Sequence, residues 1–363
     1  MPKGLQQLQV IELGGGVAAS MAGKMVADLG ARVVKIESPQ GDETRRRGPF
    51  PQGKPDPEAS GTFLFLNTNK RSLSLDLTGS GGRDPLDRLV GKADLLIHDF
   101  PPARMEAHGL EFERLAALNR SLVMLSITPF GLTGPYRDYA ASDLTLFHAG
   151  GWGWICPGDS TPLSLPPGKP FGQHALIQAG LHGAVAALAA CISSARTGIG
   201  EHIDMSIQEA VAFQLGRHTA RYPYAGVSDS RDMPMPYEPF SFYPCRDGHI
   251  FIVCPEQAQW DRLVALMGHP DWCADERFGS REGREQHGKA LKPLLAQWTA
   301  RQEMEPLFHA CQQVRVGAAA VFSPSMIERQ EQLRARDFFV TQEHSSAGQI
   351  RLPGAPYLLR EPW

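Results

Sequence analysis

The sequence predicts an α/β protein with a large Rossmann-like domain, built on a parallel sheet, and a smaller α+β domain. Three observations support this prediction. The segment Leu8–Glu37 has the pattern of a strand, a glycine turn, a helix and a second strand, which is a right-handed βαβ unit. Further strand and helix patterns then alternate with short connections, as in a parallel sheet covered on both faces. Finally, 363 residues exceed one ordinary hydrophobic core, so we expect two domains.

The first βαβ unit organises the predicted large domain. Val10–Leu13 is a mostly apolar run typical of a buried strand, and Gly14–Gly16 follow where the chain must turn sharply. Apolar residues then recur at steps of three and four over Ala18–Leu29, which predicts an amphipathic helix. Gly30 ends that helix, and Ala31–Ile36 is a second strand. Such a unit presents free N–H groups at the helix N-terminus, which suits phosphate.

The same turn also fits a dinucleotide-binding pattern. Gly14, Gly16 and Ala19 satisfy G-x-G-x-x-G/A, and Glu37 lies where an acidic residue would bind a ribose. Any tight turn between a strand and a helix favours small residues, however. The pattern alone therefore does not identify a nucleotide site.

The other elements of the large domain follow in chain order. Strands are predicted at Thr62–Leu66, Ser72–Leu77, Ala93–His98, Ser121–Thr128 and within Gly198–Ile207. Helices are predicted at Gly79–Lys92, Leu110–Leu118, Ala175–Ser194 and from Gln208 onward. A ligand of such a sheet would sit at the carboxyl ends of its strands.

The predicted domains are residues 1–221 for the large domain, 222–239 for a linker and 240–332 for the small α+β domain. The segment Tyr222–Pro239 is rich in proline and has no clear period, which favours the linker. A strand pair around Arg246–Gly248 opens the small domain, and a sequence with helical patterns follows through Cys311. Residues 333–363 are expected to return to the large domain.

Composition argues against several classes of protein. The formal net charge of −3 gives no general attraction to nucleic acid or to an anionic membrane, so neither partner is predicted. The basic clusters Arg45–Arg47 and Lys70–Arg71 fit a small polyanion or a solvated surface, and both readings stay open. The most apolar stretch, Ala179–Ile192, contains His182 and is predicted to be a buried helix, not a membrane span.

Cysteine usage points to a cytoplasmic protein. The six cysteines are scattered, with no C-x-x-C pair and no Cys/His group at zinc spacing, so no metal site is predicted. The first residues, MPKGLQQLQV, have no signal-peptide core. We therefore expect reduced thiols.

Six blocks carry a resemblance to a known family. They are VIELGGGVAASMAGKMVADLGARVVKIE, NKRSLSLDL, ADLLIHDFPP, SITPFGLTGPYRD, RTGIGEHIDMSIQEA and LRARDFF. In this order they resemble the family III CoA-transferases, also called the CaiB–BaiF family, which includes acyl-CoA racemases. The resemblance implies a Rossmann-like large domain, a small domain and two chains interlocked as a dimer. It also implies an enzyme in which an aspartate attacks an acyl-CoA thioester and passes CoA to a carboxylic acid.

The chain departs from this family at the chemical positions. Counting back from Gly180 and Gly198 puts the family's nucleophilic aspartate at Leu176, and leucine has no nucleophile. The family's basic residues are replaced by Ala107 and Thr78, and the racemase histidine by Ser142. No glycine occurs in 227–239, where a glycine-rich loop is expected. Losing two contacts to phosphate, each worth about 1.5–3 kcal/mol, would weaken CoA binding substantially.

The resemblance nevertheless places a CoA site at the first turn. The residues expected to bind CoA are Gly15, Gly16, Val17, Ala18, Asp99 and Phe100. Coenzyme A or an acyl-CoA is expected as substrate, with no covalently bound cofactor, and NAD binding is not expected.

Other polar residues could supply replacement chemistry. His174, Gln178 and His182 form a stripe on the long helix, where a histidine could act as a base or simply make a structural contact. Asp143 and Glu12 are carboxylates within the family blocks, and a structural hydrogen bond is the expected role of Asp143. Cys156 has no adjacent basic residue, so a reactive thiolate is not expected.

Three hypotheses for function follow. In the first, the chain is the subunit without a nucleophile in a heteromeric CoA-transferase, paired with a paralogous chain that carries the catalytic Asp. In the second, it is a self-sufficient acyl-CoA-processing enzyme, for example as a homodimer, with a relocated catalytic residue. In the third, it is a non-enzymatic or dinucleotide-binding protein. The acyl group and the acceptor acid are not predicted.

Overall fold

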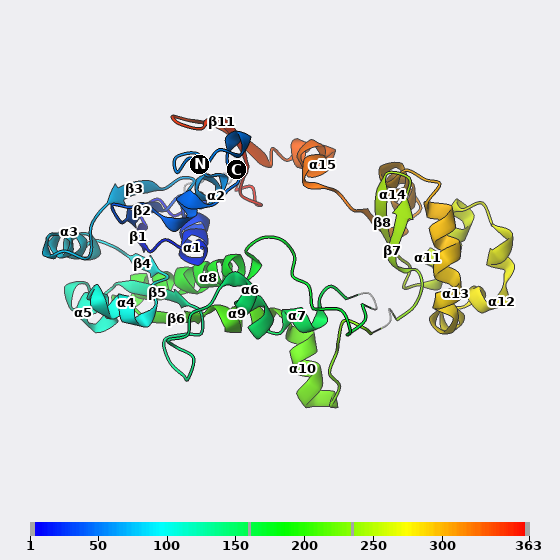
Figure 1. The fold of residues 1–363 in the computed structure, drawn as a ribbon, viewed down its shortest axis with the longest axis horizontal. Helices are drawn as coiled ribbons and strands as arrows, with labels where there is room; N and C mark the ends of the chain where they lie inside the picture. The colour runs from blue at the N-terminus through cyan, green and yellow to red at the C-terminus, as the bar shows by residue number, and fades with distance from the viewer. Residues whose placement is uncertain (1–3, 159–160, 234–235, 360–363) are drawn as a thin grey trace. The chain divides into compact units, whose positions relative to one another are not determined.

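A computed structural model describes residues 4–158, 161–233 and 236–359 of the chain. These residues fall into two compact units (Figure 1). The first comprises residues 1–156, 167–229 and 337–363, and the second comprises 157–166 and 230–336. Each unit is described by itself.

The first unit is built on a six-stranded parallel sheet with the order β3-β2-β1-β4-β5-β6. Its strands are β1 Gln9–Leu13, β2 Arg32–Glu37, β3 Arg71–Ser74, β4 Leu95–His98, β5 Val123–Thr128 and β6 His202–Ser206. The strand order reverses at β1, which pairs with β2 on one side and β4 on the other. The predicted Rossmann-like parallel sheet is therefore confirmed, and its switch point lies beside β1.

Helices cover both faces of this sheet (Figure 1). One face carries α1 Val17–Asp28, α8 His174–Thr197 and α9 Ile207–Gln214, and the other carries α3 Ser80–Val90, α4 Pro102–Ala107 and α5 Phe112–Leu118. Neighbouring strand residues divide between the two cores: Leu95 and Ile97 face α1 and α8, whereas Leu96 faces the α3–α5 side. This alternation explains why the strands read as continuous apolar runs, since both faces are buried.

One predicted strand is wrong. Thr62–Leu66 belongs to the helix α2 Gly61–Leu66, not to a strand. Ser60 caps this helix, because its Oγ accepts a hydrogen bond from the backbone N–H of Phe63 (3.1 Å). A five-residue apolar run fits either period, so the cap decides the structure here.

The predicted strand at Ser72–Leu77 is confirmed only in part. Regular pairing with β2 covers Arg71–Ser74. Leu75 still donates to the carbonyl oxygen of Glu37, but beyond it the chain leaves the sheet.

The first unit contains several further elements. They are η1 Glu43–Arg46, η2 Pro51–Gly53, α6 Asp143–Ala149, α7 Trp152–Ile155, α10 Gly216–Ala225 and the hairpin β10 Phe339–His344 with β11 Gly348–Pro353. Residues 222–225 are helical, so the predicted irregular linker begins inside α10.

The second unit contains the predicted strand pair. β7 Phe240–Cys245 and β8 Gly248–Val253 are antiparallel, and β9 Gly317–Ala320 pairs with the other edge of β8. Its helical segments are α11 Gln257–Leu266, η3 Asp271–Ala274, α12 Glu276–Gly279, α13 Arg281–Thr299, α14 Met304–Gln313, α15 Pro324–Arg329 and α16 Glu331–Ala335. The core around Tyr243 and Trp260 is separate from those of the first unit. An α+β unit of this kind agrees with the prediction for the small domain.

The long helix α8 is apolar enough and long enough to cross a membrane by composition alone. It packs, however, against α1, α9 and β5 within the first unit. Ala179, Ala184 and Ala187 face this core, whereas Val185 and Ile192 are exposed on the opposite side. α8 therefore serves as a core helix with one uncovered apolar face.

A buried ionic network ties the first two strands to the loops around them. Glu12 accepts from Lys35 (2.7 Å) and Lys70 (2.7 Å), and Lys35 also pairs with Asp42 (2.6 Å). Burial alone would raise the pKa of Glu12, but the two ammonium groups hold it below its ordinary value. A Cβ at residue 23 would lie 1.9 Å from Glu12 Oε2, so Gly23 leaves the space that this network needs.

We expect the substitution Glu12→Gln to destabilise the protein strongly. It leaves the side chain of Lys70, which is 2% exposed, without its carboxylate partner, a change that typically costs about 3–5 kcal/mol. The measurement is urea denaturation followed by circular dichroism. The control Glu58→Gln removes an exposed partner of Arg45 and should cost less than about 1 kcal/mol. Equal, small effects of both variants would contradict the role given to the network.

Candidate functional site

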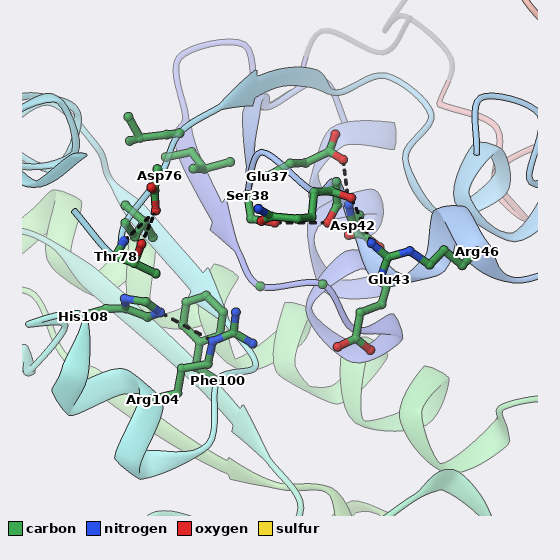
Figure 2. A pocket seen from close by; sticks show the side chains of 17 residues that line it. Glu37, Ser38, Asp42, Glu43, Arg46, Asp76, Thr78, Phe100, Arg104 and His108 are labelled. Carbon is green, nitrogen blue, oxygen red and sulfur yellow. Dashed lines mark hydrogen bonds between the residues drawn. The ribbon is translucent and has the colours of Figure 1, made fainter. Parts of the chain in front are cut away.

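A pocket of about 360 Å³ opens at the carboxyl ends of β1, β2 and β4 (Figure 2). The backbone of Gly14 and Gly15 forms one side of it. The apolar side chains on it are Ile36, Leu75, Leu77 and Phe100, and the charged ones are Glu37, Asp42, Glu43, Asp76, Arg46 and Arg104. This is the place where ligands bind to sheets with this strand order.

The turn beside the pocket is already occupied by a carboxyl group. A Cβ on Gly14 would lie 2.0 Å from Asp99 Oδ1, and one on Gly16 would lie 2.0 Å from Asp99 Oδ2. The backbone N–H of Ala19, in the first turn of α1, hydrogen bonds to Asp99. Asp99 therefore takes the position at the N-terminus of α1 where a dinucleotide-binding protein would hold a pyrophosphate.

Burial raises the pKa of Asp99 to about 7. The neighbouring carboxylates of Asp42 and Glu12 act in the same direction, while Lys35 opposes them. Asp99 therefore changes charge near neutral pH, directly beside the pocket.

The acidic residue at the end of β2 is also engaged. Glu37 accepts hydrogen bonds from Arg45 Nε (2.7 Å), Arg45 Nη2 (3.0 Å), Ser72 Oγ (2.6 Å) and the N–H of Asp42 (3.0 Å). An ionised carboxylate has about four lone-pair sites, so these donors fill it. The residue that the dinucleotide pattern assigns to the ribose is therefore not free to bind one.

The residues expected from the sequence to bind CoA lie at different depths. Gly15 and Phe100 line the pocket. Gly16 and Asp99 contact each other next to it. The side chains of Val17 and Ala18 are buried in the hydrophobic core.

Two of the pocket's side chains with N–H groups, Arg104 and His108, are not among the residues predicted from the sequence, whereas Arg46 belongs to the basic cluster predicted to fit either a small polyanion or a solvated surface. A signal for one of them was present, because Arg104 precedes Ala107 by one helical turn. The middle arginine of the cluster 45–47 could not be distinguished from its neighbours by spacing.

Leu176 lies in the first turn of α8 and is surrounded by apolar side chains. Its side chain packs against Val17 and Met21 of α1. Its backbone N–H donates to Asp143 Oδ1 (3.1 Å), and Asp143 Oδ2 pairs with Lys169 (2.8 Å). The structural role predicted for Asp143 is confirmed, because its carboxylate holds the start of α8.

The other polar candidates are engaged in structural contacts. His174 is the first residue of α8, and its Nε2 hydrogen bonds to the carbonyl oxygen of Phe171 (3.0 Å). The ring of His182 packs edge-on against Phe213. Burial raises the pKa of the Cys156 thiol, in line with the expectation of an unreactive cysteine.

A second polar cluster lies within the sheet. Ser126 Oγ is 2.6 Å from His98 Nε2 and 2.8 Å from His202 Nε2. Burial, together with His202, lowers the pKa of His98 to about 3, so this ring is neutral. None of the three residues lines the pocket, and their hydrogen bonds join β4, β5 and β6. In the described ranges, no group of three or more His, Cys, Asp or Glu side chains could hold a metal ion.

Comparison with known proteins gives a consistent result. Residues 5–362 match the model of a family described as CoA-transferase family III. Succinate–glutarate CoA-transferase of Agrobacterium fabrum is 31% identical over 351 residues, covering 93% of this chain and 85% of that protein. The succinyl-CoA:(R)-benzylsuccinate CoA-transferase subunit BbsE of Thauera aromatica is 30% identical, covering 98% of this chain and 88% of that protein.

The fold has a close counterpart among solved structures. The crystal structure of a CAIB/BAIF family protein from Brucella suis superposes with a TM-score of 0.87 at 30% sequence identity. The match covers 99% of this chain and 93% of that one. The similarity therefore extends over both units and is not limited to the Rossmann-like sheet.

We expect Asp99 to make stability depend on pH in a way that Asp99→Asn removes. An acid whose pKa is raised on folding binds its proton more tightly in the native state, so its contribution is complete below about pH 4 and is lost as the pH rises through about 7. The asparagine variant should gain stability relative to the parent across this window, by between about 1 and about 4 kcal/mol. Urea denaturation at pH 4.5 and pH 8 measures the difference. A constant offset at both pH values would contradict the raised pKa.

Proposed function

The chain belongs to CoA-transferase family III, and on that premise we propose that it forms part of an enzyme that moves CoA between an acyl-CoA thioester and a carboxylic acid. Within such an enzyme it acts as the subunit without its own nucleophile. Coenzyme A or an acyl-CoA is its ligand and substrate.

The choice of CoA as the ligand is supported mainly by the pocket at the switch point of the sheet. It is built by Gly14, Gly15 and Phe100, which belong to two of the family blocks in the sequence. It combines apolar side chains with two arginines and four carboxylates, of which Glu37 and Asp42 are paired with Arg45 and Lys35. A nucleotide with a flat base and several phosphate groups fits this combination. We propose that the adenosine end of CoA binds here, next to Gly16 and Asp99.

The subunit role rests on the environment of Leu176. The family's reaction needs a carboxylate at the start of α8, and the side chain at this place is apolar and packed against Val17 and Met21. The nearest carboxylate, Asp143, is held by Lys169 and by the Leu176 N–H, which leaves it poorly placed to attack a thioester. A partner chain with an aspartate at this position would supply the nucleophile.

A partner would also cover the exposed apolar face of α8. Val185 is 71% exposed and Ile192 is 57% exposed, and Phe213 of α9 is 73% exposed beside His182. Side chains of this kind favour contact with another chain. We propose that a paralogous chain, or a second copy of this one, packs here in the interlocked manner that the family resemblance implies.

The remaining hypotheses have less support. A relocated nucleophile would need a free polar side chain near α8, and His174 and Asp143 are both engaged. Dinucleotide binding would need a vacant N-terminus of α1, where Asp99 lies. It would also need a free Glu37, which instead accepts from Arg45. A cytoplasmic location is consistent with six free cysteines.

The isolated chain is expected to transfer no CoA. Purified protein mixed with succinyl-CoA and glutarate should give no new thioester by liquid chromatography and no hydroxylamine-sensitive adduct by mass spectrometry, because no carboxylate stands at position 176. Co-expression with a paralogue that carries Asp at this position should yield a mixed complex that is active. In that complex, Leu176→Ala in this chain should be tolerated, whereas replacing the partner's aspartate should abolish transfer. Robust turnover by the isolated chain would overturn the subunit role.

A further inference from the structure

Two arginines of the pocket have no carboxylate partner within residues 4–158, 161–233 and 236–359. Arg46 is the last residue of η1, and Arg104 lies in α4. Among the described residues, Arg46 donates only to the carbonyl oxygen of Gln40 (3.1 Å), and Arg104 hydrogen bonds only to His108 (3.4 Å). Both guanidinium groups therefore keep several N–H donors free at the pocket.

We propose that Arg46 and Arg104 are the phosphate-binding residues of this pocket and hold the phosphate groups of the nucleotide from two sides. The proposal rests on the proposed function, because it names the side chains that hold CoA at that site. The guanidinium group keeps its charge at all working pH values, and its planar fork matches phosphate oxygens. Figure 2 shows the two arginines approaching the pocket from different elements.

The neighbouring arginines are in different environments. Arg45 donates to both oxygens of Glu37 and also to Glu58, so its charge is neutralised within the protein. Arg47 is exposed, lies 4.0 Å from Glu43 and does not line the pocket. Of the three consecutive arginines, only Arg46 is both unpaired and directed to the site.

Arg104 is held in place by two aromatic rings. Its guanidinium lies 4.8 Å from the centroid of Phe100, whose ring is 5.4 Å from that of His108. Stacking on a ring leaves the edge nitrogens of arginine available for hydrogen bonds. The ring of Phe100 is only 6% exposed and supports the guanidinium, so the free edge of Arg104 is what this pair presents to the pocket as a phosphate donor.

His108 helps to position Arg104. Arginine can only donate, so His108 Nε2 accepts from Arg104 Nε (3.4 Å). His108 Nδ1 is buried and has no hydrogen-bond partner among the described residues. Because this atom is closed to solvent, the contribution of His108 to the pocket is its contact with Arg104.

This arrangement relocates the cations that the family resemblance placed at Thr78 and Ala107. Thr78 lines the pocket but carries no charge. Arg104 precedes Ala107 by three residues, so both lie on one face of α4. The positive charge has moved by one helical turn, and Arg46 supplies a second charge from η1. CoA binding is thus predicted to be stronger than the substitutions at 78 and 107 alone would suggest.

The test is calorimetric titration of the full chain with CoA and with dephospho-CoA, which lacks the ribose 3′-phosphate. Arg46→Gln and Arg104→Gln should each weaken CoA binding by about 10- to 100-fold, the range for losing a charge-assisted hydrogen bond. The matched control Arg47→Gln removes a charge from the same cluster outside the pocket and should change affinity by less than about twofold. The free energy of unfolding of all three variants should stay within about 1 kcal/mol of the parent, because among the described residues Arg46 and Arg104 have no ion-pair partner to lose and the Arg47–Glu43 pair is exposed.

The outcomes separate this proposal from the proposed function. If the parent binds CoA and only the two pocket variants lose affinity, the phosphate clamp is supported. A variant that also loses the preference for CoA over dephospho-CoA identifies the arginine that holds the 3′-phosphate, which supports the clamp further. If the parent binds CoA but either pocket variant binds as tightly as Arg47→Gln, the two-sided clamp is overturned while the proposed function stands. If the parent binds neither ligand at millimolar concentration, the proposed function itself fails.

Discussion

The buried network of Glu12, Lys35, Lys70 and Asp42 is the constraint on which the pocket depends. Each charge is removed from water, so the network is stable only when all its pairs are made together. Its carboxylates and ammonium groups join β1, β2, the segment before β3 and the loop after β2. Asp42 also caps η1 by accepting from the N–H of Thr44, and η1 carries Arg46 to the pocket. The interior charges therefore determine where the pocket's arginine lies.

The same sheet could serve several ligands, and side chains at the switch point decide among them. The strand order is that of dinucleotide-binding proteins, and the glycine turn of α1 fits their pattern. Asp99 fills the position of the pyrophosphate, and Arg45 with Ser72 occupies the acid that would hold a ribose. The cavity that remains lies along β2 and α4, with its own aromatic surface and cations. The anion site of this turn is therefore filled from within the protein, and the same fold is left with a different cavity for a ligand.

The fold was largely predictable from the sequence, and the pocket only partly. The spacing of apolar residues and the positions of the glycines predict β1, α1 and β2, because both features follow from backbone geometry. The segment Thr62–Leu66 was assigned wrongly, since its short apolar run fits both periods and the cap at Ser60 decides between them. The roles of Arg45, Arg46 and Arg47 were not predictable, because they depend on which carboxylates of distant segments reach each guanidinium. For the same reason neither reading of Lys70, a contact to a small polyanion or a solvated surface residue, is correct, because its side chain is buried against Glu12.

In the proposed complex, the adenosine end of CoA binds between Gly15, Phe100 and the two pocket arginines, in a chain with an apolar residue at position 176. The most direct measurement is a crystal structure of the protein with CoA bound. We expect density for the nucleotide beside Phe100 and Gly15, with phosphate oxygens within hydrogen-bond distance of Arg46 and Arg104, and Leu176 still packed against the cluster that contains Val17. Density for CoA at another site, or a nucleotide whose phosphates lie on the α1 N-terminus with Asp99 displaced, would contradict it.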